Sequence, residues 1–520
     1  MSVPTTTIDE ASGDGAGVQR APSWWRRPPS TPVVVLGLAM VIWSLTVTKL
    51  VWLRHDKFLT NDFDLGIHDQ SLWLVAHFKS WNTVYGGPVF AHHAMFMYIL
   101  MMPLVWLGGG PNLWNFLQVM ALALTAVPLY LLAKRRWHND WAAAALGIVW
   151  LLSPTTVYLV QETFHPEVMA LPFLVTGYYL ATTRPDGTPR EVLRHNLLTV
   201  GFLLAAMLWK EDIAIVVTMM GLVLLWRGRR RFAWAVVLGG LAYTVIIGAW
   251  FVPMLAHGDT AYGMLYGHLG KSPTQVFVNS VKHPTWFFKR LDDNNAVSYA
   301  NRIQAPWGWM GLLSPITMLM AVPQFFINIL TNAKFTFVIR YHYQAVPLVV
   351  SAIAAVEGIT WAKTKHVILG HTALALLLVS SLITTVRWGP MPYARRYNRW
   401  DWGTLQVQTG GWQAALDRIG DDPSGVSAMY QLVPHLSQRD NIFTYPNPWI
   451  RSNYLADSGH GRSPEKVMWL VVIPERLNPP ALALFNSLVQ SGEFGDLQTV
   501  EGVVTARRLK PPTGANPVQH

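Results

Sequence analysis

The stretch that decides the fold follows the first long apolar segment and reads Thr60-Asn61-Asp62-Phe63-Asp64-Leu65-Gly66-Ile67-His68-Asp69-Gln70. It places three carboxylates within eight residues, directly after a segment long enough to cross a bilayer. A carboxylate this close to a membrane is costly unless it faces water, a partner or a ligand. The stretch therefore predicts a polar site at one surface of a membrane protein.

The composition is that of a polytopic helical membrane protein. Of the 520 residues, 51% are hydrophobic and 13% are charged, whereas a soluble protein has about 25% charged residues. Several runs exceed the ~18 apolar residues that indicate a membrane span. The net charge of +11 lies mostly in short loops between these runs, which is typical of the positive-inside bias and argues against nucleic acid binding. The chain has no cysteine, which excludes disulfides and Cys-ligated zinc.

Positive charges orient the predicted spans. Arg26 and Arg27 place the start of the first span, at about 33–53, in the cytoplasm. Residues 93–108 are apolar, but a crossing there would put Lys134-Arg135-Arg136 outside, so we interpret them as an interfacial or re-entrant helix. Further spans are expected at 111–133, 141–159, 167–182, 196–209, 213–226, 232–256, 344–361 and 366–386, with two short or broken spans over 306–338, for about ten or eleven in all.

The predicted fold class is mainly α, a multi-pass plasma-membrane bundle with an extracytoplasmic α/β domain. The predicted regions are a disordered cytoplasmic tail over 1–30, a transmembrane domain over 31–386 with outer loops at 54–110 and 257–304, the α/β domain over 387–510, and a disordered tail over 511–520. Within the α/β domain, strand-like runs at 425–428, 441–445, 467–473 and 497–508 accompany helix-like runs near 430–437 and 480–491. Strands that alternate with helices indicate a small α/β domain.

Three later stretches carry ionisable residues that the same topology places outside. They are Phe164-His165-Pro166-Glu167, Lys210-Glu211-Asp212 and Arg340-Tyr341-His342-Tyr343. Because the basic loops alone set this topology, the clustering of acids on one side is independent support for it. We expect the three stretches to line one site together with residues 60–70.

The stretches at 60–70 and 164–167 each have a structural interpretation as well as a functional one. Asp62 and Asp64 share a face of an extended segment, and either suits a general base within reach of its proton, but Asp64 also suits the cap of a short helix. His165 and Glu167 suit a metal or a pyrophosphate-bearing ligand. They equally suit the start of a helix, with Pro166 and an acidic residue in the first turn.

The remaining polar residues are similarly open to two interpretations. Lys210 suits contact with a phosphate, although Lys210-Glu211-Asp212 also fits a tight turn with neutralised charge. Arg340 favours an anionic ligand, because an outer Arg runs against the charge bias.

Aromatic and histidine residues near these charges are ambiguous too. Tyr341 and Tyr343 are consistent with an interfacial aromatic belt. His92 and His93 form a possible metal pair, but adjacent side chains lie about 100° apart on a helix. The motifs of zinc proteases, P-loop enzymes, α/β-hydrolases and Rossmann folds are absent from the sequence.

The sequence resembles the DUF2079 family of predicted membrane proteins in several short motifs. They are Phe63-Asp64-Leu65-Gly66-Ile67 with Asp69-Gln70, residues 164–167 and 210–212, and Leu432-Val433-Pro434-His435-Leu436-Ser437 with Arg439-Asp440. The resemblance runs over about 60–508. Phe63 stands where Tyr is common in the family, which leaves the carboxylate of Asp64 in place.

That family in turn resembles the GT-C superfamily of integral membrane glycosyltransferases. The resemblance implies a catalytic Asp in the first outer loop, interfacial helices before the second span and a polyprenyl-phosphate sugar donor. On this basis Asp64 is the expected base, with Asp62 as a rival.

We therefore expect an inverting membrane glycosyltransferase that moves a sugar from a polyprenyl-phosphate lipid to a cell-envelope glycan or glycolipid acceptor. The groups expected to bind the donor phosphate are Lys210, Arg340, Tyr341, Tyr343 and His165. The groups expected to orient them, or to hold a divalent cation, are Glu167, Glu211, Asp212, His92, Asp69 and Gln70. The alternatives are a transporter or flippase of a lipid-linked or anionic solute, which the absence of an internal repeat disfavours, and a membrane scaffold.

Overall fold

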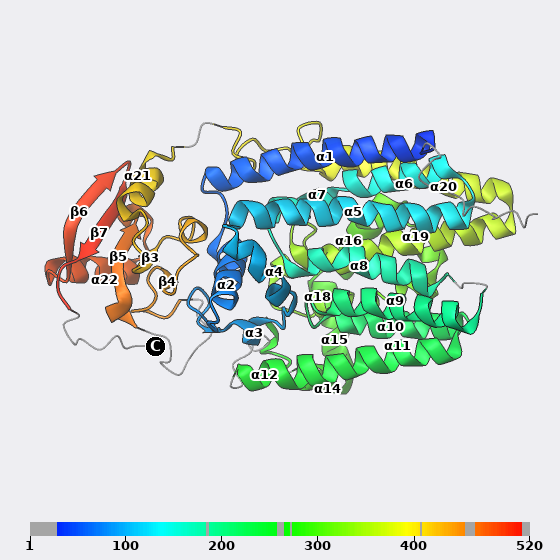
Figure 1. Ribbon diagram of the computed structural model, residues 1–520, viewed down its shortest axis with the longest axis horizontal. Coiled ribbons are helices and arrows are strands. Elements are labelled where there is room, and N and C mark those ends of the chain that lie inside the picture. Colours follow the sequence, from blue (N-terminus) through cyan, green and yellow to red (C-terminus); the bar gives the residue numbers. More distant parts are fainter. Residues whose placement is uncertain are drawn as a thin grey trace, which may run out of the picture.

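A long bundle of helices carries a small β-sheet domain at one end (Figure 1). The computed structural model describes residues 29–183, 187–256, 265–270, 273–405, 408–452 and 463–511. The predicted polar tails at 1–30 and 511–520 therefore lie almost wholly outside the described residues. We call the end of the bundle beside the sheet the sheet end.

The helices begin where the sequence provides start signals. Helices α5 and α8 begin at Pro111 and Pro166, because proline lacks the N–H that a first helical turn leaves unpaired. Thr188 and Glu191 form a capping box at α9. The helices of the bundle are α1 Thr31–Asp56, α2 Ile67–Ala76, α3 Val89–His92, α4 Met97–Trp106, α5 Pro111–Trp137, α6 Asp140–Leu152, α7 Pro154–Glu162, α8 Pro166–Ala181, α9 Pro189–Met207, α10 Ile213–Trp226, α11 Arg230–Tyr243, α12 Val252–Leu255, α14 Pro273–Lys282, α15 Pro284–Asp293, α16 Ala296–Gln304, α17 Pro315–Met318, α18 Val322–Ile329, α19 Ala345–Lys365 and α20 Val367–Trp388.

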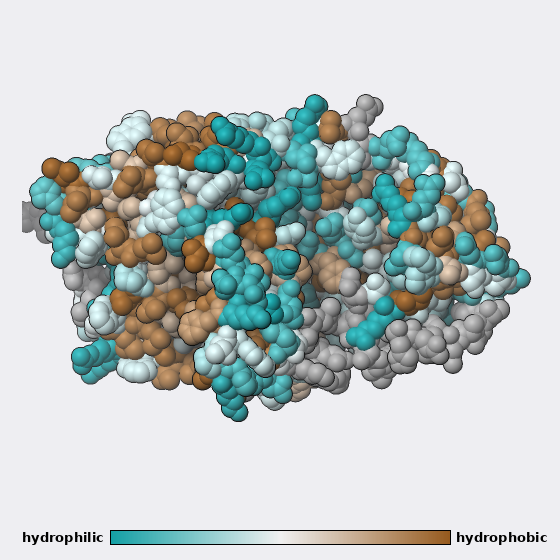
Figure 2. All heavy atoms as spheres, turned by 180° about the vertical axis from the view of Figure 1, so that it is seen from behind, coloured by the Kyte–Doolittle hydropathy of each residue, from teal (hydrophilic) through white to brown (hydrophobic). Residues whose placement is uncertain are grey.

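Among the described residues, five helical segments are long and apolar enough to cross a membrane, and a sixth forms if α6 and α7, bent by 42°, count as one. This is fewer than the ten or eleven spans expected. Helices α8 and α10 have only 16 and 14 residues, short of the ~20 that a span needs. Figure 2 shows apolar side chains over much of the helical part of the molecule, as in a membrane-embedded protein.

The structure agrees with the prediction for residues 93–108 but not with the prediction for residues 306–338. Residues 93–108 contain the 10-residue helix α4 with Pro103 inside it, in agreement with a segment that does not cross. The two short spans expected over 306–338 are not formed, since the longest helix there, α18, has 8 residues. The expected outer loop at 257–304 instead contains helices α14, α15 and α16.

The C-terminal part forms a five-stranded sheet with two helices. The strand order is β4-β3-β5-β7-β6, and β3 pairs in parallel with β4 and β5 while β7 pairs antiparallel with β5 and β6. The elements are α21 Gly410–Ile419, β3 Gly425–Ala428, β4 Ile442–Thr444, β5 Val467–Val472, α22 Pro479–Gln490, β6 Phe494–Val500 and β7 Val503–Arg508, and a short hairpin β1 Trp81–Asn82 with β2 Gly87–Pro88 lies in the bundle. The helix expected near 430–437 is only a 3₁₀ turn, Val433–His435, centred on Pro434. Helix α21 was not predicted.

The sheet domain docks on the segment that follows α1. Phe58, Ile67 and Tyr85 from that segment share one buried hydrophobic cluster with Trp412 and Val433 of the sheet domain. Within this junction the carboxylate of Asp69 is buried and accepts hydrogen bonds from Trp114 Nε1 (2.6 Å), Ser437 Oγ (2.6 Å) and Gln438 Nε2 (3.1 Å). One side chain thus joins α2, α5 and the sheet domain.

Replacing Asp69 by Ala is expected to weaken this junction. Three buried donors would lose their acceptor, and an unsatisfied buried donor costs about 1–3 kcal/mol. We expect a lower melting temperature in detergent and faster proteolytic release of the sheet domain. Asp417→Ala, at an exposed carboxylate of α21, is the control and should change neither. Equal behaviour of the two variants would contradict a docking role for Asp69.

Candidate functional site

Asp64 lies in a π-helical turn, Asp62–Gly66, between α1 and α2. The turn packs against the sheet domain so closely that a Cβ on Gly66 would lie 3.1 Å from Val433 Cγ1. The side chain of Asp64 keeps 23% of its surface exposed, and its Oδ1 lies 3.4 Å from His165 Nε2. Asp64 therefore combines partial solvent access with a fixed histidine neighbour.

His165 is held by a strained corner between α7 and α8. Thr163 has φ 91° and ψ −170°, a region that is almost restricted to glycine and costs about 1–3 kcal/mol for other residues. Two side chains of α5 hold the corner: Gln118 accepts from His165 N at 2.5 Å and donates to Thr163 O, and Asn115 accepts from Phe164 N at 3.1 Å. Strain that the surroundings over-determine in this way is typical of functional sites.

Glu162 and His342 complete a compact cluster around His165. The His165 and His342 rings stack with centroids 3.9 Å apart, and His342 Nδ1 lies 2.8 Å from Glu162 Oε1. One nitrogen or oxygen from each of Asp64, Glu162, His165 and His342 lies within 4.8 Å of the others. We call these four residues the His–carboxylate cluster.

Lys210 extends the cluster into a longer polar network. His342 Nε2 faces Glu167 Oε1 at 3.7 Å, and Lys210 Nζ lies 3.0 Å from the same oxygen and 3.6 Å from Asp212. Glu211, next in the chain, contacts His93 Nδ1 at 2.7 Å and accepts from Ala94 N. The four stretches singled out in the sequence therefore meet at the sheet end of the bundle.

The pKa values at this site reflect burial and neighbouring charge. Burial raises the pKa of Asp62 to about 6, although Thr444 donates to it. Burial also opposes ionisation of Asp64, but the neighbouring His165, with His342 and Arg54 nearby, holds its pKa below the usual value. For His165, burial acts against protonation, and the charges of Glu162 and Asp64 outweigh it and raise its pKa to about 9.

Some predicted site residues lie elsewhere. Asp69 and Gln70 hold the sheet domain: Gln70 Nε2 donates to Thr83 Oγ1 at 2.8 Å and to Arg439 O at 3.2 Å. Asp62 accepts from Thr444 of β4. Each of these three side chains has a hydrogen-bond partner in the sheet domain, so all three face the domain junction.

The predicted phosphate ligands do not form one group. Lys210 is buried and paired with two carboxylates, so it is not a free cation. Arg340 is half exposed, lies 3.2 Å from Asp401 and stacks over Tyr158. Tyr343 lies against His342 with ring centroids 4.0 Å apart, whereas Tyr341 is exposed and contacts Phe335.

His92, predicted as an orienting or metal-binding residue, lies beside the network. Its ring is 4.6 Å from that of His93 and 4.9 Å from that of Tyr85. The Nδ1 atom of His92 is buried without a hydrogen-bond partner. His92 therefore packs near the network and is not one of the four residues of the His–carboxylate cluster.

Sequence reasoning missed an arginine-lined pocket beside the cluster. The pocket has a volume of about 450 Å³ and is lined by Tyr158, Ser298, Asn301, Arg302, Val338, Ile339, Arg340, Trp388, Arg396, Asn398 and Asp401. The side chains of Arg302 and Arg396 make no hydrogen bond or ion pair with any part of the chain that the structure describes. Arg54 of α1 reaches the same pocket, because its guanidinium donates to the backbone carbonyl of Asp401.

Signals for the missed residues were weak. His342 stands inside a stretch already singled out and Glu162 lies two residues before another, but nothing in the sequence pairs them. Arg302 and Arg396 are single basic residues among many.

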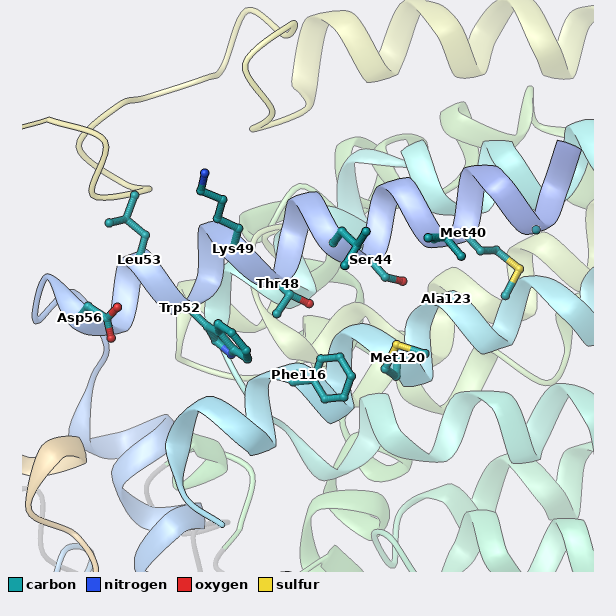
Figure 3. Close-up of a pocket in the computed structure, with 13 residues that line it drawn as sticks. Met40, Ser44, Thr48, Lys49, Trp52, Leu53, Asp56, Phe116, Met120 and Ala123 are labelled. Atoms are coloured by element: carbon teal, nitrogen blue, oxygen red, sulfur yellow. The ribbon is translucent and has the colours of Figure 1, made fainter. Parts of the chain in front are cut away.

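An apolar groove of about 880 Å³ lies apart from the network, between α1 and α5. Met40, Ser44, Thr48, Phe116 and Met120 line its length, with Asp56 at one end (Figure 3). Its lining is mostly apolar, so we place no chemistry there. The groove lies on a different side of α1 from Val47 and Val51, which face the buried core.

The fold of the chain is similar to that of a solved membrane protein. The crystal structure of ArnT from Cupriavidus metallidurans bound to undecaprenyl phosphate matches with a TM-score of 0.53 and 12% sequence identity, covering 94% of this chain and 99% of that chain. This match confirms the predicted GT-C-like, mainly helical fold with a β-containing C-terminal region. Among curated proteins, the comparison finds no match.

A family model also matches most of the sequence. The model, described as "Predicted membrane protein (DUF2079)", covers residues 54–476. This range includes the π-helical turn, the whole His–carboxylate cluster and the docking segment at 432–440. The chain therefore belongs to the DUF2079 family of predicted membrane proteins.

Proposed function

We propose that this protein is a GT-C-like glycosyltransferase that moves a sugar from a polyprenyl-phosphate lipid to a glycan or glycolipid acceptor. The observation that carries the proposal is the position of Asp64. It is a half-buried carboxylate beside an arginine-lined pocket, at one end of a bundle whose fold is similar to that of a protein crystallised with undecaprenyl phosphate.

In this reaction Asp64 is the general base and the polyprenyl phosphate is the leaving group. Asp64 takes the proton of an acceptor hydroxyl while the hydroxyl oxygen attacks the anomeric carbon of the donor. The bond from that carbon to the phosphate oxygen breaks, and polyprenyl phosphate leaves with the electron pair. Attack from the face opposite the phosphate inverts the anomeric centre.

The arginine-lined pocket suits the leaving phosphate. Among the described residues the guanidinium groups of Arg302 and Arg396 have no partner, and Arg340 contacts Asp401 and the Tyr158 ring. Arginine binds phosphate through paired N–H donors, and fixed donors that face developing negative charge are a large term in catalysis. This assignment replaces Lys210, whose charge is already neutralised.

Lys210 has a supporting role in this proposal. It fixes Glu167, which faces His342, which in turn contacts Glu162. The lysine thereby orients the side chains around Asp64 and need not touch the donor.

The proposed reaction also sets the orientation in the membrane. The sheet end faces the extracytoplasmic side of the plasma membrane. The opposite end carries the basic residues of a second pocket, among them Arg136, Arg227 and Arg229 to Arg231. This arrangement is consistent with the positive-inside bias.

Replacing Asp64 by Asn is expected to abolish transfer. Loss of the base should lower kcat at least about 100-fold, while the isosteric amide leaves the fold intact. The measurement is transfer from a polyprenyl-phosphate sugar by purified protein in detergent, with native mass spectrometry of the bound lipid. We expect the donor to remain on the variant.

The matched control is Asp421→Asn, at an exposed carboxylate of the sheet domain. It should transfer at the wild-type rate. Wild-type turnover by Asp64→Asn would exclude Asp64 as the base. Movement of the lipid across proteoliposomes without any transfer would instead support the transporter alternative.

Replacing Arg302 by Gln tests the phosphate assignment. A hydrogen bond to a charged group contributes about 1.5–3 kcal/mol, and 1.4 kcal/mol is tenfold in affinity, so KM for the donor should rise about tenfold or more. Arg476→Gln, at an exposed arginine of the sheet domain, should leave KM unchanged. An unchanged KM in Arg302→Gln would place the phosphate elsewhere.

A further inference from the structure

The His–carboxylate cluster has the composition of a metal site. Two imidazoles and two carboxylates from three separate segments place one ligand atom each within 4.8 Å of the others. We propose that Glu162, His165 and His342 bind a divalent transition-metal ion, with Asp64 beside its open coordination position.

Both histidines present a ring nitrogen to the cluster. His165 Nδ1 donates to the backbone carbonyl of Thr163 at 3.1 Å, which directs Nε2 toward the cluster. His342 Nδ1 donates to Glu162 Oε1 at 2.8 Å, and a bound cation would take the place of this proton. Metal-binding histidines almost always donate their second N–H to a carbonyl or carboxylate, as His165 does.

Glu162 provides an independent sign of an unfilled position. Its side chain is 8% exposed, and its Oε2 atom is buried without a hydrogen-bond partner. A buried carboxylate oxygen without a partner is costly, and a bound cation would satisfy it. The 3.4 Å from His165 Nε2 to Asp64 Oδ1 also exceeds the ~2.7–2.9 Å of a charge-assisted hydrogen bond.

The net charge of the polar network also favours a bound cation. The network contains five carboxylates, those of Asp64, Glu162, Glu167, Glu211 and Asp212, and its cations are Lys210, Arg54 and the His165 imidazolium. Buried charges in proteins are paired or coordinate metals. A divalent ion in the cluster would offset most of this excess negative charge.

The donor set selects the class of metal. Imidazole nitrogens suit Zn²⁺, Fe²⁺ or Ni²⁺, whereas Mg²⁺, Ca²⁺ and Mn²⁺ prefer oxygen ligands. Three protein ligands with an open position are typical of catalytic zinc sites. If the proposed function holds, the ion would lie beside the reacting phosphate and stabilise its negative charge, but metal binding itself does not depend on that function.

The test measures zinc content and stability of the full-length protein in detergent. Protein stripped with chelator, loaded with zinc chloride and desalted should retain about one Zn²⁺ per chain, and zinc should raise its melting temperature. Glu162→Gln and His342→Gln should lose both effects. His77→Gln, at an exposed histidine outside the network, should retain both.

A second readout covers variants that fail to fold. Cobalt in place of zinc on the wild-type protein should give the visible absorption of a nitrogen- and oxygen-ligated ion. The proposal is wrong if wild-type protein retains no zinc and shows no cobalt spectrum, or if a folded Glu162→Gln variant binds zinc like the wild type. Zinc binding without sugar transfer would overturn the proposed function alone, and transfer by zinc-free protein would overturn the metal's role.

Discussion

Ionisable side chains buried at the sheet end impose the constraint on which the rest of the structure depends. A buried charge must be paired or bound to a ligand, and breaking a buried pair by removing one partner costs about 3–5 kcal/mol. Here each partner comes from a different part of the chain: Asp64 from the turn after α1, Glu162 and His165 from the α7–α8 corner, Lys210 from between α9 and α10, and His342 from before α19. The network can form only when these helix ends meet, so it specifies their arrangement.

The sheet domain is part of this arrangement and not an appended unit. Asp69, three residues after the π-helical turn that carries Asp64, binds Ser437 and Gln438 from the sheet side and Trp114 from α5. Gly66 allows Val433 to approach the same turn. The domain thereby holds the backbone around Asp64, which connects the family resemblance at 432–440 with the one at 63–70.

Much of the architecture follows from local sequence signals. Long apolar runs predicted α1, α5, α19 and α20, and charge parity excluded a crossing at 93–108. Alternating strand-like runs predicted β3, β4, β5 and the β6–β7 pair. Errors arose where local signals were weak or misleading: Pro434 shortened a predicted helix to one turn, and the broken region at 306–338 forms pieces too short to cross.

The candidate site was predictable as a set of stretches but not as a set of contacts. Lys210 was expected to contact a phosphate or to be neutralised within its own turn, and the structure pairs it both with Asp212 in that turn and with Glu167, 43 positions away. Asp69 and Gln70 appeared to belong with Asp64, but they lie five and six residues beyond it, and at about 100° per helical residue their side chains point away from that of Asp64. Glu162 and His342 lie 180 positions apart, and no local pattern joins residues so distant.

The sequence by itself determined that the chain is a membrane protein, where most of its long helices lie, and which polar stretches contribute to the candidate site. Those properties depend on hydrophobicity, helix length and charge, which are local and additive. Only the tertiary structure decided which carboxylates face each other, which cations are already neutralised, and which arginines remain available. Pairing depends on distances of a few ångströms between segments far apart in sequence, and only the packing of the helices brings those segments within reach.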